Sequence, residues 1–303
     1  MNPQSFVFSW DVLPRSSSRV RPTATVLALA IALMPAAPQA ADRAEELLAR
    51  ARAELGGEQL ATVTALSARG EFRRLFGERE ITGDLTIDLA VPDRIRRTEE
   101  MGVAGGPSMT RTVALNRGEF WEDMTNRGGG FFRMAPGGAG GPRGPGGREI
   151  TEEDRARFRE MQKRRLEGEL RRYLLVWLLR TDAPVKHGGR AEAEDGSAEV
   201  LEVDTDGLGP MRLFLDEQSM QPLMLTYEGF RPRVRMMRPR RPAPNEPARR
   251  VTFELRFDDY REVDGIRLPH RLTTSIEGEP TEEWTIDRYK VNPSFKASHF
   301  EER

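Results

Sequence analysis

The sequence of 303 residues contains no cysteine. Disulfides, thiolate metal sites, cysteine nucleophiles and a lipid-modified N-terminal cysteine are therefore excluded. Histidine is almost as scarce, with only His187, His270 and His299. The three lie far apart in sequence and form no H-E-x-x-H pair. The chain also lacks a G-x-S-x-G elbow and a P-loop. We accordingly predict no catalytic residue, no metal ligand and no cofactor.

Neither sign of charge is in excess. Lysine and arginine together number 47, aspartate and glutamate 48, and the net charge is −1. This balance disfavours a globally basic protein that binds nucleic acid. The chain is also polar overall: hydrophobic residues make up 38% of it, and the mean hydropathy is −0.59. These values exclude a polytopic membrane protein.

One apolar run lies near the N-terminus. Arg15, Arg19 and Arg21 precede the stretch 23–34, and prolines and alanines follow it. This is the order of a secretory signal peptide, and the run is shorter than the ~20 residues of a transmembrane helix. We predict a signal peptide over 1–41, with an exported product in the periplasm of a Gram-negative cell. An uncleaved membrane anchor is the alternative.

Two segments have helical periodicity. Residues 42–56 place apolar side chains on one face, with Asp42 as the N-cap and a Gly-Gly pair as the stop. A second helix is predicted from Thr151, which begins a capping-box-like Thr-Glu-Glu-Asp sequence, to about residue 180. Its last two turns, 173–179, are apolar almost all round, so other elements must cover them on most sides.

Much of the remaining chain alternates apolar and polar residues at the two-residue period of a strand. The clearest case places Val251, Phe253, Leu255 and Phe257 on one face. No helical segment interrupts the strands after residue 185, which favours an antiparallel meander that closes toward a barrel or folds into a sandwich. The predicted strands are 66–76, 82–91, 94–101, 111–115, 119–124, 198–204, 211–215, 222–227, 250–260, 266–276 and 282–291.

Two low-complexity insertions interrupt this pattern. Residues 125–149 are rich in glycine and proline, and we predict a disordered loop there. Residues 231–250 are rich in arginine and proline, and we predict a mobile, positively charged loop. The arginines are typical of a solvated spacer, or of contact with an acidic partner or an anionic membrane surface. Nucleic acid is disfavoured because the leader exports the protein.

The chain carries a series of short motifs that resemble a known family. They are Leu213-Phe214-Leu215-Asp216, Gln221-Pro222-Leu223, Asp259-Tyr260-Arg261-Glu262-Val263-Asp264-Gly265-Ile266-Arg267-Leu268-Pro269, Trp284-Thr285-Ile286, Val291-Asn292-Pro293 and Phe300, with the opening Leu47-Leu48-Ala49-Arg50-Ala51 and Gly56-Gly57. The chain resembles the exported LolA/LolB-like family, in particular the outer-membrane lipoprotein-sorting-like proteins of Gram-negative bacteria. Coverage is most of a single domain over 42–303, apart from the two insertions. Within the longest motif, Asp264 and Gly265 predict a tight turn with positive φ.

The resemblance implies a fold and a cavity. The expected fold is mainly β: an incompletely closed antiparallel β-barrel with an N-terminal helix, and with a lid or plug helix over an apolar cavity for acyl chains. The lid would be the helix over 151–180. Ordinary core packing is the alternative for every residue of this site. By alternation and apolar spacing, the candidate lining residues are Leu85, Ile87, Leu89, Phe253, Leu255 and Phe257, and the candidate lid residues are Leu170, Tyr173, Leu174 and Trp177.

The function that follows from this resemblance is that of a non-enzymatic periplasmic carrier. It would take a lipid or an acylated protein as its partner and withdraw the acyl chains from water, without a covalent step or a cofactor. Two alternatives stay open. One is an envelope sensor or interaction module of the same fold, whose arginine-rich loops bind an acidic partner. The other is an exported hydrolase whose site has no recognisable motif.

Overall fold

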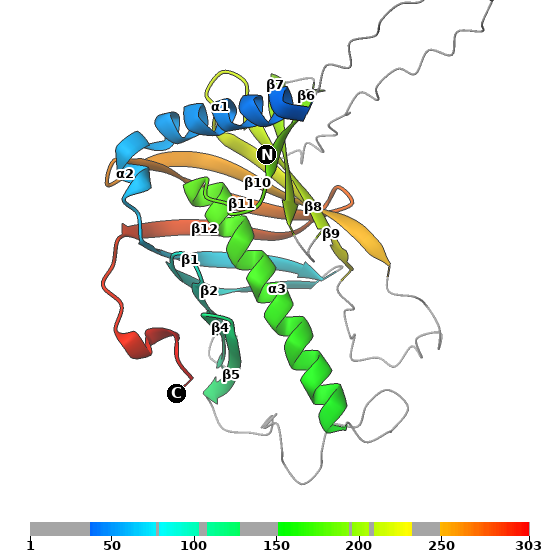
Figure 1. Ribbon diagram of the computed structural model, residues 1–303. Helices are drawn as coiled ribbons and strands as arrows, with labels where there is room; N and C mark the ends of the chain where they lie inside the picture. The colour runs from blue at the N-terminus through cyan, green and yellow to red at the C-terminus, as the bar shows by residue number, and fades with distance from the viewer. Residues whose placement is uncertain are drawn as a thin grey trace, which may run out of the picture.

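The computed structural model describes residues 37–76, 79–102, 108–127, 151–193, 196–205, 209–231 and 249–302. Its elements are labelled in Figure 1. The helices are α1 (Ala37–Leu55), α2 (Gly57–Ala61), α3 (Glu152–Leu178) and the 3₁₀ helix η1 (Ala297–Phe300). The strands are β1 (Ala65–Phe76), β2 (Arg79–Ala90), β3 (Arg94–Gly102), β4 (Ser108–Asn116), β5 (Glu119–Arg127), β6 (Val185–Ala193), β7 (Gly196–Thr205), β8 (Gly209–Asp216), β9 (Pro222–Phe230), β10 (Arg250–Val263), β11 (Ile266–Ile276) and β12 (Glu279–Val291).

All of these strands belong to one 12-stranded antiparallel sheet. Strands β1 to β5 form one meander and β6 to β12 a second, and the pairing of β1 with β12 joins the two. The edges are β5 and β6, which do not pair with each other in the described part of the chain. The sheet therefore curls without closing, which confirms the predicted fold class.

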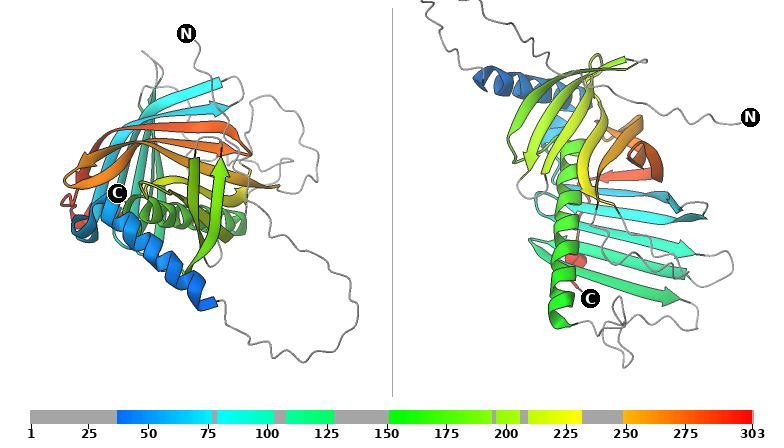
Figure 2. Two further views of the ribbon diagram at one scale, coloured as in Figure 1. Left: turned by 90° about the horizontal axis from the view of Figure 1, so that it is seen from above. Right: turned by 90° about the vertical axis from the view of Figure 1, so that its right-hand side faces the viewer.

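Helix α3 lies on the concave side of the curled sheet (Figures 1 and 2). Thr151 caps it as predicted: its hydroxyl accepts a hydrogen bond from the Asp154 backbone N–H, and the Thr151 N–H donates to the Asp154 carboxylate. Leu179 ends the helix in the left-handed conformation. Among the described helices, none is both long and apolar enough to cross a membrane.

Most predicted elements are present, and the departures have physical reasons. The first helix begins at Ala37, so Asp42 lies inside it and is not its cap. Strand β6 was not among the predicted ranges, because two glycines and alternating charges hide its period. The predicted signal peptide lies outside the described residues up to residue 36. The two predicted loops lie outside them over 128–150 and 232–248, while residues 125–127 belong to β5.

The C-terminal segment packs on the outer face of the sheet. Phe300 is fully buried, and its carbonyl oxygen accepts a hydrogen bond of 2.8 Å from Trp121 Nε1 on β5. His299 Nε2 lies 2.7 Å from Asp88 Oδ2, and Ser67 Oγ donates to Asp88 Oδ1 at 2.6 Å. Asp88, which alternation places on the polar face of β2, is therefore buried there without breaking the pattern.

Two local features fit the strands together. Asp264 and Gly265 have φ of 51° and 78°, which confirms the predicted tight turn between β10 and β11. Gly70 marks a register shift where β1 meets β12. A Cβ atom at Gly70 would lie 1.9 Å from the Thr285 carbonyl oxygen, so only glycine permits this approach of the two backbones.

Gly70→Ala is expected to lower the free energy of unfolding by about 2 kcal/mol or more, because one of the two backbones must move. Gly102→Ala is the matched control, since its new Cβ would come no nearer than 3.9 Å to any neighbour. Urea denaturation of both variants measures the difference. Equal losses at the two positions would contradict the role given to Gly70.

Candidate functional site

The predicted lining residues come together in one core on the concave face. Leu85, Ile87 and Leu89 of β2 are buried, and so are Leu255 and Phe257 of β10. Three strands, β1, β12 and β11, separate β2 from β10 in the sheet, yet both sets belong to the same apolar cluster. Phe253 is only half-buried and stacks on Tyr227 of β9, with ring centroids 5.1 Å apart.

The predicted lid residues cover this core. Leu170, Tyr173, Leu174 and Trp177 are all buried, and Trp177 has no exposed surface. The Tyr173 and Trp177 rings stack at 4.8 Å. Both rings also meet β12: Tyr173 lies 5.9 Å from Trp284, and Trp177 lies 5.9 Å from Tyr289. The side chains of α3 thus occupy the concave face.

A buried ion pair ties α3 to the sheet. Arg97 Nη1 of β3 lies 2.5 Å from Glu169 Oε1 of α3, and both side chains are about nine-tenths buried. The Tyr173 hydroxyl donates a second hydrogen bond to the same Glu169 oxygen at 2.9 Å. Because Glu169 lies on the buried side of an otherwise apolar stretch of helix, this contact fixes where α3 sits along β3.

The pair continues into a charged network on the sheet. Arg97 Nε lies 3.3 Å from Glu99 Oε1, and Arg74 of β1 donates to Glu99 at 3.1 Å and to Glu282 of β12 at 2.5 Å. Glu99 is 2% exposed, and its second oxygen has no partner among the described residues. Two arginines are therefore shared among three carboxylates, Glu169, Glu99 and Glu282, inside the concave face.

The network shifts the pKa values of its members. Burial alone raises the pKa of the Glu99 carboxyl, but the positive charges of Arg97 and Arg74 outweigh burial and hold that pKa below its usual value. Burial and the charge of Glu169 raise the pKa of Tyr173 well above its usual value. Tyr173 therefore keeps its proton, which is the proton it donates to Glu169.

Two buried nitrogens near the aromatic stack have no partner among the described residues. They are Trp177 Nε1 and His270 Nε2, and both rings meet the edge or face of Tyr289. His270 Nδ1 lies 2.6 Å from the Ile286 carbonyl oxygen, so this nitrogen carries a proton. The indole N–H of Trp177 is thus a buried donor without an acceptor among the described residues.

Sequence reasoning missed the charged network. Arg97 and Glu169 are 72 residues apart and belong to no motif. A local signal did exist, because Glu169 occupies the same helical face as Leu166, Leu170 and Tyr173. A lone acid within an apolar stripe indicates a buried partner.

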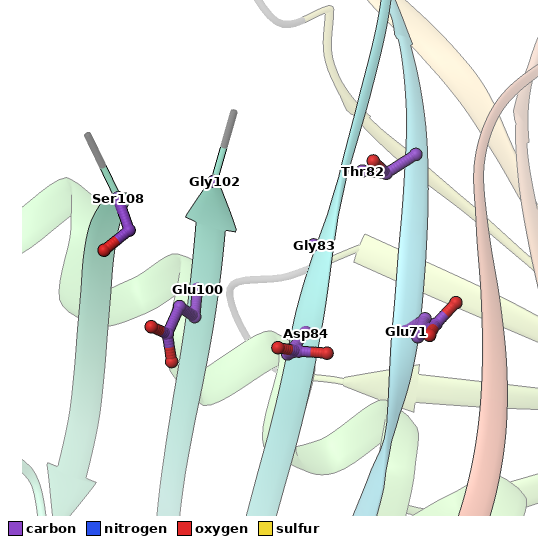
Figure 3. A pocket seen from close by; sticks show the side chains of 7 residues that line it. All are labelled: Glu71, Thr82, Gly83, Asp84, Glu100, Gly102 and Ser108. Carbon is purple, nitrogen blue, oxygen red and sulfur yellow. The ribbon is translucent and has the colours of Figure 1, made fainter. Parts of the chain in front are cut away.

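A pocket lies on the opposite, outer face of the sheet (Figure 3). Its volume is about 330 Å³, and polar side chains from neighbouring strands line it. Glu71, Asp84 and Glu100 stand side by side across β1, β2 and β3. The described residues contain no group of His, Asp and Glu side chains able to hold a metal ion. This pocket is unsuited to an acyl chain.

No family model and no curated protein matches the sequence. Among solved structures, a LolA superfamily protein from Nitrosomonas europaea is 10% identical with a TM-score of 0.46, over 86% of this chain and 97% of that one. A domain described as an outer-membrane lipoprotein-sorting protein, from Vibrio parahaemolyticus, is 12% identical with a TM-score of 0.41 over the same shares. A DUF1329 family protein from Desulfovibrio piger is 9% identical with a TM-score of 0.43, over 85% and 97%. These structures include proteins of the family that the sequence resembles. Their sequence identities and TM-scores are too low to indicate what this chain binds.

Arg97→Met is expected to lower the free energy of unfolding by about 3–5 kcal/mol, because it leaves Glu169 buried without its cation and Glu99 with Arg74 alone. Arg157→Met is the matched control: Arg157 pairs with Glu153 on the same helix as Glu169, but both side chains are over 70% exposed. We expect less than about 0.5 kcal/mol there. Urea denaturation gives both values, and a near-neutral Arg97→Met variant would show that the pair does not anchor α3.

The lowered pKa of Glu99 predicts a pH dependence of stability. A carboxyl whose pKa is lower in the folded than in the unfolded chain stabilises the fold above its unfolded pKa of about 4.3, and this contribution disappears as the pH falls through the folded pKa. The Glu99→Gln variant should therefore lose less stability than the wild type between about pH 5 and pH 3. Glu71→Gln, an exposed acid on the outer face, is the control. Parallel curves for all three proteins would contradict the assignment.

Proposed function

We propose that the protein is a periplasmic carrier that sequesters acyl chains between α3 and the concave face of its sheet. The observation that carries this proposal is the kind of cover α3 provides. A single helix lies on a face that is apolar apart from the charged network, and is held there by apolar contacts and one buried ion pair. Such a cover can be exchanged for a ligand of similar character without unfolding the sheet.

The energies of this exchange are of the right order. An acyl chain of about twelve carbons gains roughly 9 kcal/mol on leaving water, at ~0.8 kcal/mol per CH₂. Exposing a buried leucine or aromatic side chain costs about 1.5–3 kcal/mol. Displacing the four lid residues therefore costs about 6–12 kcal/mol, which is comparable with what the acyl chain gains. Binding of this kind is reversible, which a carrier requires.

The proposed lining and lid are the two sets of side chains that meet on this face. Leu85, Ile87 and Leu89 on one side, and Phe253, Leu255 and Phe257 on the other, would contact the acyl chain. The lid residues Leu170, Tyr173, Leu174 and Trp177 would move aside. The indole N–H of Trp177, which has no acceptor among the described residues, could then donate to the polar end of the ligand.

The Arg97–Glu169 pair would keep the empty carrier closed. Breaking it leaves charges in a poorly solvated place, which opposes the movement of α3 until a ligand supplies compensating contacts. The partner in this proposal is a lipid or an acylated protein, and the compartment is the periplasm, reached by the predicted signal peptide. The mechanism is sequestration, so it contains no covalent step and uses no cofactor.

We expect the mature chain to take up a fluorescent twelve-carbon fatty acid, and uptake to accelerate backbone amide exchange in the buried half of α3. Glu169→Gln should speed uptake several-fold because Arg97 then holds α3 less tightly. Glu153→Gln, which alters an exposed acid of the same helix, should leave the rate unchanged. Stopped-flow fluorescence and hydrogen exchange measure the two effects.

Two results would count against the carrier. Absence of fatty-acid uptake by the folded wild type would favour the interaction module, in which the arginine-rich loops bind an acidic partner. Uptake with no change of exchange in α3 would place the ligand elsewhere on the protein.

A further inference from the structure

The two edge strands of the sheet, β5 and β6, differ in what covers them. At β6, helix α1 packs beside the strand, as Figure 2 also shows. At β5, no described strand pairs with the outer edge, and residues 123–126 are all exposed. Natural sheets usually cover, shorten or bend an edge strand, because its unpaired backbone groups attract other strands. An edge strand of nine residues that pairs with no further strand in the described part of the chain therefore needs an explanation.

Exposed apolar side chains gather around this edge. Met124 of β5 is 45% exposed, and Phe158 and Met161 of α3 are 52% and 57% exposed. These are three of the five large apolar residues that are exposed in the described chain. The N-terminal end of α3 lies at the β5 end of the sheet in both Figures 1 and 2.

The first turns of α3 bury no apolar side chain against the sheet. Burial of apolar side chains along α3 begins only at Leu166. The fourteen residues before it correspond to roughly 20 Å of helix at 1.5 Å per residue. Neighbouring strands lie about 4.8 Å apart, so this length of helix is sufficient to cover a further strand added to β5.

The charge of β5 indicates what kind of strand would fit. Glu119 and Asp123 lie on the outer face and form no ion pair with a described residue, whereas Glu122 on the inner face is paired with Arg111 at 2.8 Å. Glu301 adds a further acid directly after Phe300, which contacts β5 through Trp121. The outer side of the edge thus carries two acids that no described cation pairs with, and on its inner side the acid Glu122 is paired while Met124 is exposed.

We propose that β5 is the docking edge for an extended segment of another protein, which adds to the sheet as a further strand. Basic residues of the segment face Glu119 and Asp123, and its alternate apolar residues face Met124 and the first turns of α3. A second copy of this chain fits poorly, because two β5 strands side by side would bring their acids together. The proposal is independent of acyl binding.

The test uses two labelled ten-residue peptides, one of alternating valine and lysine and one of alternating valine and glutamate. Fluorescence anisotropy with the full mature chain should show binding of the lysine peptide only. Glu119→Lys/Asp123→Lys should weaken that binding about tenfold and allow the glutamate peptide to bind. Glu71→Lys/Asp84→Lys makes the same charge change on inner strands of the same face, and should alter the affinity less than twofold.

A backbone control separates strand addition from simple charge attraction. The lysine peptide with alternate residues N-methylated keeps its charge but loses donors, and it should bind at least tenfold more weakly than the parent peptide. Equal binding of the two original peptides, or an equal loss in the inner-strand variant, would overturn the proposal. Dimerisation through β5 in sedimentation experiments would also overturn it, because a second copy of the chain would then occupy the edge. Peptide binding that appears only after deletion of residues 128–150 would overturn it as well, because that segment would then be the occupant.

Discussion

The constraint on which the rest of this structure depends is that its sheet does not close. A closed barrel has no open side, whereas an open sheet leaves an apolar concave face that something else must cover. Here the cover is α3, whose last turns are apolar on nearly all sides. The same opening leaves two sheet edges, one beside α1 and one, β5, that pairs with no further strand among the described residues. The face covered by α3 and the candidate docking edge are thus two consequences of one topology.

Within that largely apolar face, the charged network fixes the position of α3 and contributes little to the attraction between α3 and the sheet. Apolar contacts are not directional, whereas the ion pair requires Glu169 to lie opposite Arg97. The network also sits among residues that a ligand would have to displace. In the proposed carrier, stability and opening would therefore depend on the same few side chains.

Sequence patterns predicted much of the fold and less of the site. Alternation along β2 and β10 identified Leu85 to Leu89 and Phe253 to Phe257, and Thr151 marked the start of α3, because these signals are local. The Arg97–Glu169 pair has no local signature and is created by the fold. Strand β6 was hidden by Gly188 and Gly189, which carry no side chain to alternate. The burial of Asp88 depends on His299, more than 200 residues away.

The central claim is that the concave face takes up acyl chains, and native mass spectrometry with lipid extraction tests it most directly. The sample is the mature chain purified from the periplasm of a Gram-negative cell. The account predicts co-purifying phospholipid or acylated peptide, which disappears in an Ile87→Asp variant that circular dichroism shows to be folded. A folded wild-type chain that carries no more lipid than the variant would contradict it.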